Sequence, residues 1–111
     1  MPAPFVLVVT TVGSRDEADR LARALVEQRL AACAQISAID SCYVWEGAVR
    51  HEAEFRILFK VAASAYDAAE RAIRALHSYD LPAIHAIPIE RAHAPYADWV
   101  VANSTPRPDL R

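Results

Sequence analysis

Glycine, cysteine and lysine are scarce in this chain of 111 residues, which holds two glycines, two cysteines and a single lysine. Gly13 and Gly47 are too far apart in the sequence to form a glycine-rich loop that cradles phosphate groups. Cys33 and Cys42 form no C-x-x-C motif, and two cysteines are too few for a disulfide framework. The net charge of −2 leaves no excess of basic residues for phosphate contacts, so we expect no nucleic-acid partner.

Other absences restrict the location and the chemistry of the protein. The apolar run that begins at Phe5 is too short for a membrane span, and no basic segment of a signal peptide precedes it. We therefore expect a cytoplasmic protein without a membrane span. The sequence also has no Ser-x-Gly elbow and no pair of carboxylates with an orienting base, so we expect that it is not an enzyme.

The composition is that of a soluble globular protein, with 54% hydrophobic and 23% charged residues. A chain of this length and composition can form one hydrophobic core. We predict a single domain over residues 1–104. Two prolines follow in residues 105–111, which we expect to be a frayed C-terminal tail.

Hydrophobic periodicity and capping residues predict the order strand, helix, strand, strand, helix, strand, short helix. The first helix is expected to begin at a capping box, Ser14 to Glu17, and to end near Cys33, while Ser64 is expected to cap the second. The expected elements are a strand Phe5–Val12, hairpin arms Ala34–Trp45 and Val49–Val61, a strand Ile84–Glu90 and a short helix from Pro95. This order predicts an α+β, ferredoxin-like βαββαβ fold with both main helices on one face of an antiparallel sheet.

The hairpin is long for a domain of this size. Glu46-Gly47 is typical of a hairpin tip, and each arm of about 12 residues would reach about 40 Å. A compact domain of this length is about 35 Å across. The hairpin should therefore project beyond the domain, and we expect another copy of the chain to cover the overhang.

A set of motifs resembles the CutA divalent-cation tolerance proteins over roughly Val6 to Ser104. The motifs are Leu30-Ala-Ala-Cys33, Tyr43-Val-Trp45-Glu46-Gly47, Glu54, Lys60, His77-Ser-Tyr79-Asp-Leu-Pro82, Tyr96 and Trp99. The resemblance implies a cytoplasmic, ferredoxin-like homotrimer whose hairpins wrap around neighbouring subunits. It also implies a link to copper and other divalent cations. Such trimers are similar to the PII signalling proteins, which bind small effectors in clefts between subunits.

The chain departs from the family pattern at several positions. Ser78 replaces a proline, Asp80 a glutamate or glutamine, Ala83 a glutamate and Gln35 an asparagine, and the first loop lacks its usual proline. In one pattern of the family that this chain resembles, copper is bound by a cysteine of the first strand and a histidine of the His77 loop. The strand position here is Thr10. The glutamate missing at Ala83 would have been a hard oxygen ligand.

His77 and Cys33 are the candidate metal ligands. Imidazole suits copper or zinc, and a cysteine sulfur suits Cu(I). His77 alternatively caps a helix end, and Cys33 is alternatively a small buried hydrophobe. His51, His85 and His93 show no ligand spacing and are expected to be surface or structural.

A second set of residues is predicted to line a ligand cleft or a trimer interface: Tyr43, Trp45, Glu54, Lys60, Tyr79 and Trp99. Lys60 interrupts an apolar strand, and Glu54 is about 20 Å away along it, so its partner must come from elsewhere. Lys60, with Tyr79 and Trp45, could hold a small anionic metabolite in a cleft between subunits, or it could form an interface salt bridge. Three functions are therefore open: a homotrimer for copper or other divalent cations, a PII-like sensor, and a structural assembly module.

Overall fold

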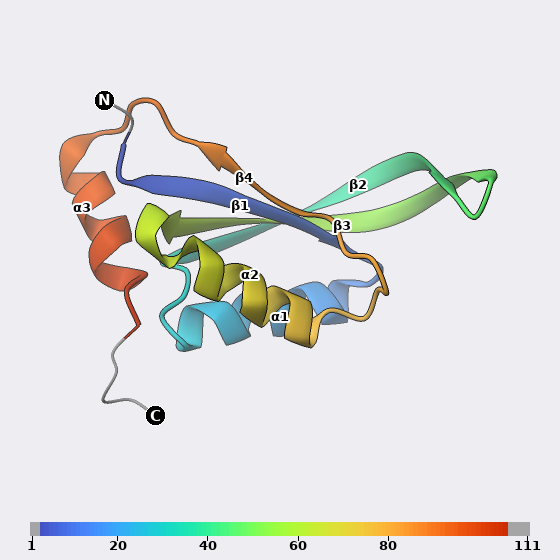
Figure 1. The fold of residues 1–111 in the computed structure, drawn as a ribbon, viewed down its shortest axis with the longest axis horizontal. Helices are drawn as coiled ribbons and strands as arrows, with labels where there is room; N and C mark the ends of the chain where they lie inside the picture. The colour runs from blue at the N-terminus through green and yellow to red at the C-terminus, as the bar shows by residue number, and fades with distance from the viewer. Residues whose placement is uncertain (1–2, 107–111) are drawn as a thin grey trace.

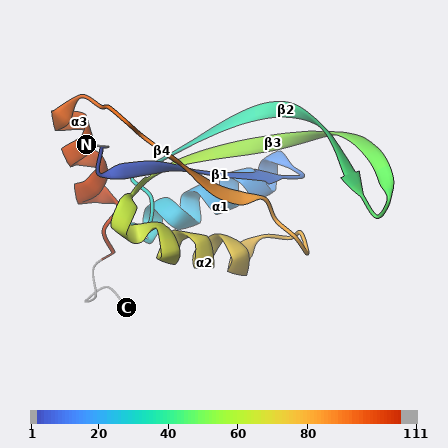
Figure 2. The same cartoon turned by 45° about the horizontal axis from the view of Figure 1, so that its top comes forward.

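The computed structural model describes residues 3–106 and confirms the predicted ferredoxin-like order of elements (Figure 1). The strands are β1 (Phe5–Val12), β2 (Cys33–Trp45), β3 (Ala48–Ala62) and β4 (Ile84–Pro88). The helices are α1 (Arg15–Glu27), α2 (Tyr66–Leu76) and α3 (Ala94–Asn103), with a 3₁₀ turn at Ala63–Ala65. All strand pairs are antiparallel in the order β2-β3-β1-β4, and α1 and α2 cover the same face of the sheet (Figures 1 and 2).

The core lies between this face of the sheet and the two helices. The alternation predicted for the second hairpin arm is confirmed, because Ile57, Phe59 and Val61 are fully buried while Leu58 and Lys60 between them are half-buried. Leu25 of α1 and Ile73 of α2 close the core from the other side. No helix within residues 3–106 is both long enough and apolar enough to span a lipid bilayer.

The helix ends depart from the sequence predictions in detail. The Ser14 hydroxyl caps α1 by accepting the Glu17 N–H at 3.1 Å, but the Glu17 carboxylate bonds to Ser78 rather than completing the capping box. The helix also ends earlier than predicted, at Glu27. The predicted Ser64 cap is wrong, since Ser64 lies inside the 3₁₀ turn and α2 begins without a side-chain cap.

The hairpin tip is the predicted one. Glu46 and Gly47 have φ values of 51° and 78°, as a two-residue type I′ turn requires, and Trp45 pairs with Ala48 across it. Beyond the pairing of Val12 with Phe55, β2 and β3 pair only with each other. The ribbon curves away past the helices (Figure 2), and the longest dimension of the molecule is 44 Å. The predicted overhang is therefore present.

The C-terminal helix lies at the opposite end of the molecule (Figure 1). Proline in its first turn confirms the predicted start, and Ala97 and Val100 pack on Phe5 in a second, smaller cluster. The predicted frayed tail is described only at Thr105 and Pro106, and residues 107–111 lie outside the described part of the chain.

Candidate functional site

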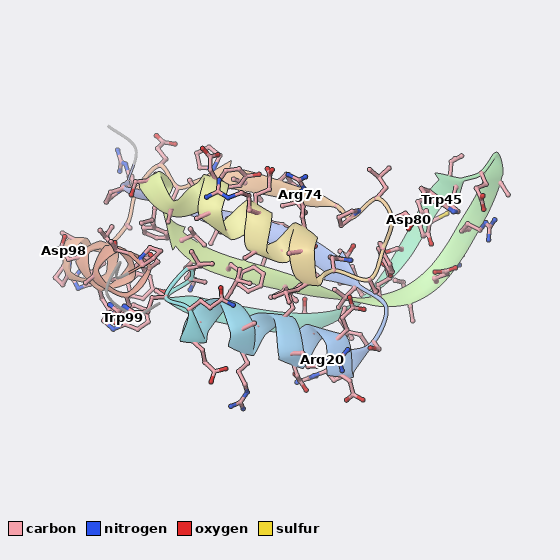
Figure 3. All side chains as sticks on the ribbon, turned by 60° about the horizontal axis from the view of Figure 1, so that its bottom comes forward. Arg20, Trp45, Arg74, Asp80, Asp98 and Trp99 are labelled. Carbon is pink, nitrogen blue, oxygen red and sulfur yellow. The ribbon has the colours of Figure 1, made fainter. Side chains whose placement is uncertain are left out.

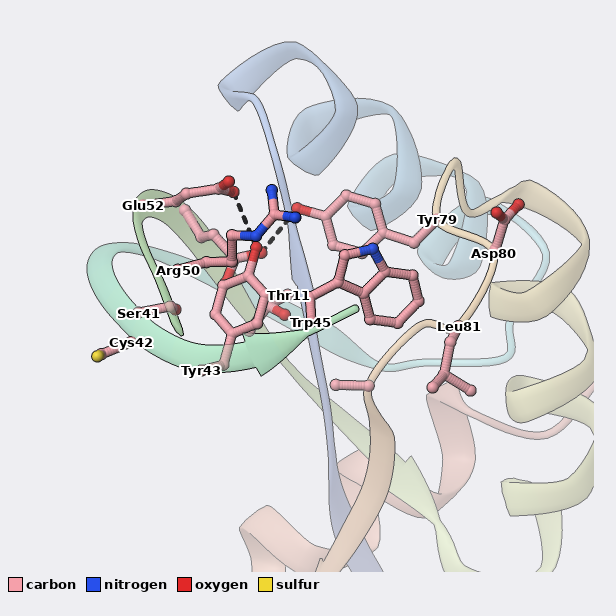
Figure 4. A pocket seen from close by; sticks show the side chains of 12 residues that line it. Thr11, Ser41, Cys42, Tyr43, Trp45, Arg50, Glu52, Tyr79, Asp80 and Leu81 are labelled. Atoms are coloured by element: carbon pink, nitrogen blue, oxygen red, sulfur yellow. Dashed lines mark hydrogen bonds between the residues drawn. The ribbon is translucent and has the colours of Figure 1, made fainter. Parts of the chain in front are cut away.

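A pocket of about 690 Å³ lies between the overhanging half of the hairpin and the loop that follows α2 (Figure 4). Its lining residues are Thr11, Ser41, Cys42, Tyr43, Trp45, Arg50, Glu52, Glu54, Tyr79, Asp80, Leu81 and Ala83. Four of the residues predicted from the sequence for a cleft are among them: Tyr43, Trp45, Glu54 and Tyr79. The curvature of the ribbon brings its aromatic side chains toward the loop, so segments far apart in the sequence share one cavity.

Two tyrosine hydroxyls hold two carboxylates of the pocket. Tyr79 donates to Oε2 of Glu54 at 2.7 Å, and Tyr43 donates to Oε2 of Glu52 at 2.9 Å (Figure 4). Burial, followed by the hydrogen bond to Glu54, raises the pKa of Tyr79, and the hydrogen bond to Glu52 raises the pKa of Tyr43. Both phenols therefore stay protonated and act as donors at neutral pH.

The charge of the pocket is acidic. Glu52, Glu54 and Asp80 contribute carboxylates, and Arg50 is the only basic residue of the lining. The Arg50 guanidinium lies 4.0 Å from Glu46 at the hairpin tip. Glu54 has only 6% of its surface exposed and forms no salt bridge within residues 3–106. The pocket is thus better suited to a cation than to an anion.

His77 anchors the loop that carries Tyr79. Its Nδ1 accepts the Tyr79 N–H at 3.1 Å, so its Nε2 is the protonated nitrogen and donates to the Thr11 carbonyl at 2.8 Å. The His77 side chain is fully buried. Glu17 holds the same loop by accepting the Ser78 N–H at 3.0 Å and the Ser78 hydroxyl at 2.9 Å. With both ring nitrogens hydrogen-bonded, a metal could bind His77 only if the loop contact were broken.

Gly13 lets the loop approach the end of β1. A Cβ atom at this position would lie 3.2 Å from the Tyr79 hydroxyl, which is closer than most real contacts. The glycine therefore permits the position from which Tyr79 reaches Glu54.

Cys33 is not near His77. It pairs with Lys60, which pairs with Leu7 of β1, whereas His77 contacts Thr11 four residues further along that strand, a distance of about 13 Å. Within residues 3–106 no group of three or more histidine, cysteine or acidic side chains is arranged to hold a metal. The two predicted metal ligands are therefore not brought together within one chain.

Lys60 and Trp99 do not line this pocket, so a cleft that joins Lys60 with Tyr79 and Trp45 is not formed within one chain, and such a cleft between subunits stays a prediction. The Lys60 ammonium lies 5.2 Å from the ring centroid of Tyr96, which stacks on Trp99 at 5.8 Å. Figure 3 places Trp45 and Asp80 at one end of the molecule and Trp99 at the other. The predicted separation of about 20 Å between Lys60 and Glu54 along β3 keeps Lys60 away from this pocket. The partner that Lys60 lacks on its own strand is Tyr96 of α3.

The structure also pairs two residues that were not combined in the sequence prediction. Cys42 of β2 lies directly opposite His51 of β3, and both are exposed. Side chains alternate along a strand, so this pair lies on the face of the ribbon opposite Tyr43 and Trp45. In Figure 4 the sulfur of Cys42 points away from the Tyr43 ring. The signal was present in the sequence, because a two-residue tip at Glu46-Gly47 fixes which residues face each other.

Comparisons with known proteins agree with this fold along the chain. The family model described as CutA1 divalent ion tolerance protein matches residues 6–103. The divalent-cation tolerance protein CutA of Archaeoglobus fulgidus is 38% identical over 93 residues, which are 84% of this chain and 91% of that protein. The chloroplastic protein CutA 1 of rice (Oryza sativa subsp. japonica) is 37% identical over 92% of this chain, which spans 58% of the rice protein.

A solved structure gives the same result. The periplasmic divalent cation tolerance protein CutA from Archaeoglobus fulgidus superposes with a TM-score of 0.88 and 35% identity, covering 91% of this chain and 99% of that one. One of these relatives is named chloroplastic and another periplasmic, so the cytoplasmic location of this protein stays a prediction. The chain belongs to the CutA1 divalent ion tolerance protein family.

Proposed function

We propose that this protein acts in divalent metal tolerance by binding copper or another divalent cation as a homotrimer, and that it catalyses no reaction. Membership of the CutA1 family supports the role in metal tolerance. The ligand, the assembly and the absence of catalysis are the parts that experiments must test.

The observation that carries the proposal for the metal is the cross-strand pair of Cys42 and His51. Residues directly opposite each other in an antiparallel pair have Cβ atoms roughly 4.5–5.5 Å apart, so a sulfur and an imidazole nitrogen can reach one ion. These donors suit copper and zinc. Two ligands leave coordination positions open, and water or a neighbouring subunit would complete them.

Two features of the hairpin support assembly with other copies of the chain. Val44 and Val49, which face each other near the hairpin tip, are 70% and 74% exposed, although both are large and apolar. The β2 strand, 13 residues long, forms an edge of the sheet. A long edge strand promotes aggregation unless something covers it, and a neighbouring subunit would do so.

Calorimetric titration of Cu(II) and Zn(II) tests the metal sites. We expect Cys42→Ser and His51→Ala each to weaken binding at least tenfold, whereas Cys33→Ser and His77→Ala should leave it nearly unchanged. Loss of binding only in the Cys33 and His77 variants would restore the ligands first predicted from the sequence. Unchanged binding in all four variants would refute both sites.

Native mass spectrometry of the purified protein tests the assembly and the metal together. A mass of three chains is expected, with copper or zinc bound in proportion to the number of chains after loading. A monomer at micromolar concentration would refute the homotrimer. Loss of metal from the Cys42→Ser trimer, with the assembly intact, would separate the two parts of the proposal.

The alternative prediction, a PII-like sensor of a small anionic metabolite, has less support. The lysine expected to hold the anion lies beside the Tyr96 ring, outside the pocket of its own chain, and this pocket carries three carboxylates against one arginine. A thermal-shift screen with anionic metabolites tests this alternative. A compound that stabilises the wild type but not Arg50→Gln would favour it over metal binding.

A further inference from the structure

Glu54 is a buried carboxylate without a cationic partner in the described part of the chain. Its only hydrogen-bond partner there is the Tyr79 hydroxyl, and 6% of its surface is exposed. Burying a carboxylate is costly unless a positive charge or several hydrogen bonds compensate for the lost water. Glu54 also lines the pocket, so an external cation can reach it. The structure thus has a place where a positive charge is missing.

The size and the lining of the pocket restrict which cation fits. A volume of about 690 Å³ falls in the range of pockets that hold small organic molecules, and it greatly exceeds that of one metal ion. A hard metal ion would need six or more oxygen ligands, whereas Glu52 and Glu54 each already accept a tyrosine hydroxyl. These features favour a larger cation with an apolar body.

Aromatic side chains provide the surface for such a body. Tyr43, Trp45 and Tyr79 line the pocket, and Leu81 of the loop lies across from Trp45 (Figure 4). Aromatic faces attract ammonium groups, and they also pack against the methylene groups that carry the charge. Asp80 adds a third carboxylate, from the loop side.

We propose that this pocket binds an organic ammonium ion, with its amine hydrogen-bonded to Glu54 and its carbon chain packed between Trp45 and the loop carrying Tyr79. The Tyr79 hydroxyl remains on one oxygen of Glu54, and the amine donates to the other. An aliphatic diamine suits the site, because its second amine can approach Asp80 or Glu52. The side chains of the proposed metal ligands lie on the other face of the ribbon, although Cys42 also borders this pocket.

Three five-carbon probes that differ only in their end groups test the sign of the charge. They are 1,5-diaminopentane, 1,5-pentanediol and pentanedioate, titrated by calorimetry into the assembled, chelator-treated protein. We expect the diamine to bind, the diol to bind at least tenfold more weakly, and the dianion to give no saturable heat. Equal affinity for the diamine and the diol would overturn the proposal. So would the absence of diamine binding up to about 10 mM.

Matched variants locate the binding. Glu54→Gln keeps an acceptor for Tyr79 but removes the charge, and it should weaken diamine binding roughly tenfold to a hundredfold. Trp45→Leu should weaken it several-fold. Glu46→Gln at the hairpin tip and Trp99→Leu on α3 are the controls and should leave it unchanged. Equal effects of Glu54→Gln and Glu46→Gln would show a diffuse charge effect and overturn the site.

Native mass spectrometry of the same samples shows whether the positive charge beside Glu54 comes from a bound amine or from a basic side chain of another subunit. If Glu54→Gln dissociates the assembly and the wild type binds no diamine, the missing positive charge belongs to a neighbouring subunit and the proposal is wrong. His51→Ala, at a metal-ligand position that does not line the pocket, should leave diamine binding intact. Failure of the metal site and failure of the amine site are therefore distinguishable.

Discussion

Ser104 joins the end of α3 to the end of β3, and replacing its hydroxyl should destabilise the protein. The residue is fully buried. Its Oγ accepts the Ala62 N–H at 2.8 Å and donates to the Val100 carbonyl. The Ser104 N–H bonds to the Val101 carbonyl, so the hydroxyl is what satisfies Val100 at the helix C-terminus, where backbone carbonyls lack helical partners.

The magnitude follows from the two groups that Ser104→Ala would leave unpaired. A buried donor or acceptor without a partner costs about 1–3 kcal/mol. The Ala62 N–H and the Val100 carbonyl should together lower the free energy of unfolding by at least about 2 kcal/mol. For a domain of about 100 residues this corresponds to a melting temperature lower by about 8 °C or more.

Thermal unfolding at one fixed protein concentration measures this effect, because the stability of an assembly depends on concentration. Thr105→Ala is the matched control: its hydroxyl makes the same kind of bond, to the Val101 carbonyl at 2.8 Å, but it is exposed. The control should change the melting temperature by no more than about 2 °C, as exposed substitutions usually do. Equal shifts in the two variants would refute the reasoning from burial.

Three further predictions concern single side chains. Because the pKa of Tyr79 is raised above its usual value of 10.0, the tyrosine ionises first in unfolded chains, and the stability of the protein should fall as the pH rises above about 10. Melting temperatures measured from pH 8 to 11 should fall less steeply for Tyr79→Phe than for the wild type, and parallel curves would contradict this prediction. Gly47→Ala should lower the free energy of unfolding in urea by about 1 kcal/mol, since φ is 78° and a Cβ there touches nothing, and no change would contradict the turn geometry. Lys60→Met should remove the cation from the Tyr96 ring and cost about 0.5–1 kcal/mol, while diamine affinity stays constant; loss of affinity would return Lys60 to the pocket.

The sequence predicts most of the fold because the strands and helices have strong periodic patterns. Alternation along Phe55–Val61 correctly assigns the faces of β3, and Pro88 in β4 correctly indicates an edge strand. The start of α2 could not be predicted in the same way. The Ala62 N–H bonds to Ser104, and the Ala63 N–H bonds to the Pro4 carbonyl, so contacts from both ends of the chain hold the segment before the helix. Local capping rules do not include such contacts.

The candidate site is less predictable, because its composition depends on which ends of the elements meet. The motif residues that resemble the family fall into two groups at opposite ends of the sheet, with Tyr79 and Glu54 in one and Lys60 and Trp99 in the other. Order along the sequence cannot separate these groups. The distance of about 20 Å along β3 was available from the sequence, but the cation–π partner of Lys60 depends on the packing of α3.

The pairing of Cys42 with His51 shows how much further a hairpin tip can be used. Once Glu46 and Gly47 are taken as a two-residue turn, Trp45 must face Ala48, and every earlier pair follows by counting outward. Counting three pairs further places Cys42 opposite His51, as the register of β2 and β3 confirms. Taken singly, Cys42 belongs to no C-x-x-C motif and His51 shows no ligand spacing, so the sequence prediction missed the pair. A candidate metal site therefore follows from a turn of two residues together with strand geometry. The burial of the Glu54 carboxylate, in contrast, depends on the folded position of the loop that carries Tyr79, and local sequence patterns do not predict it.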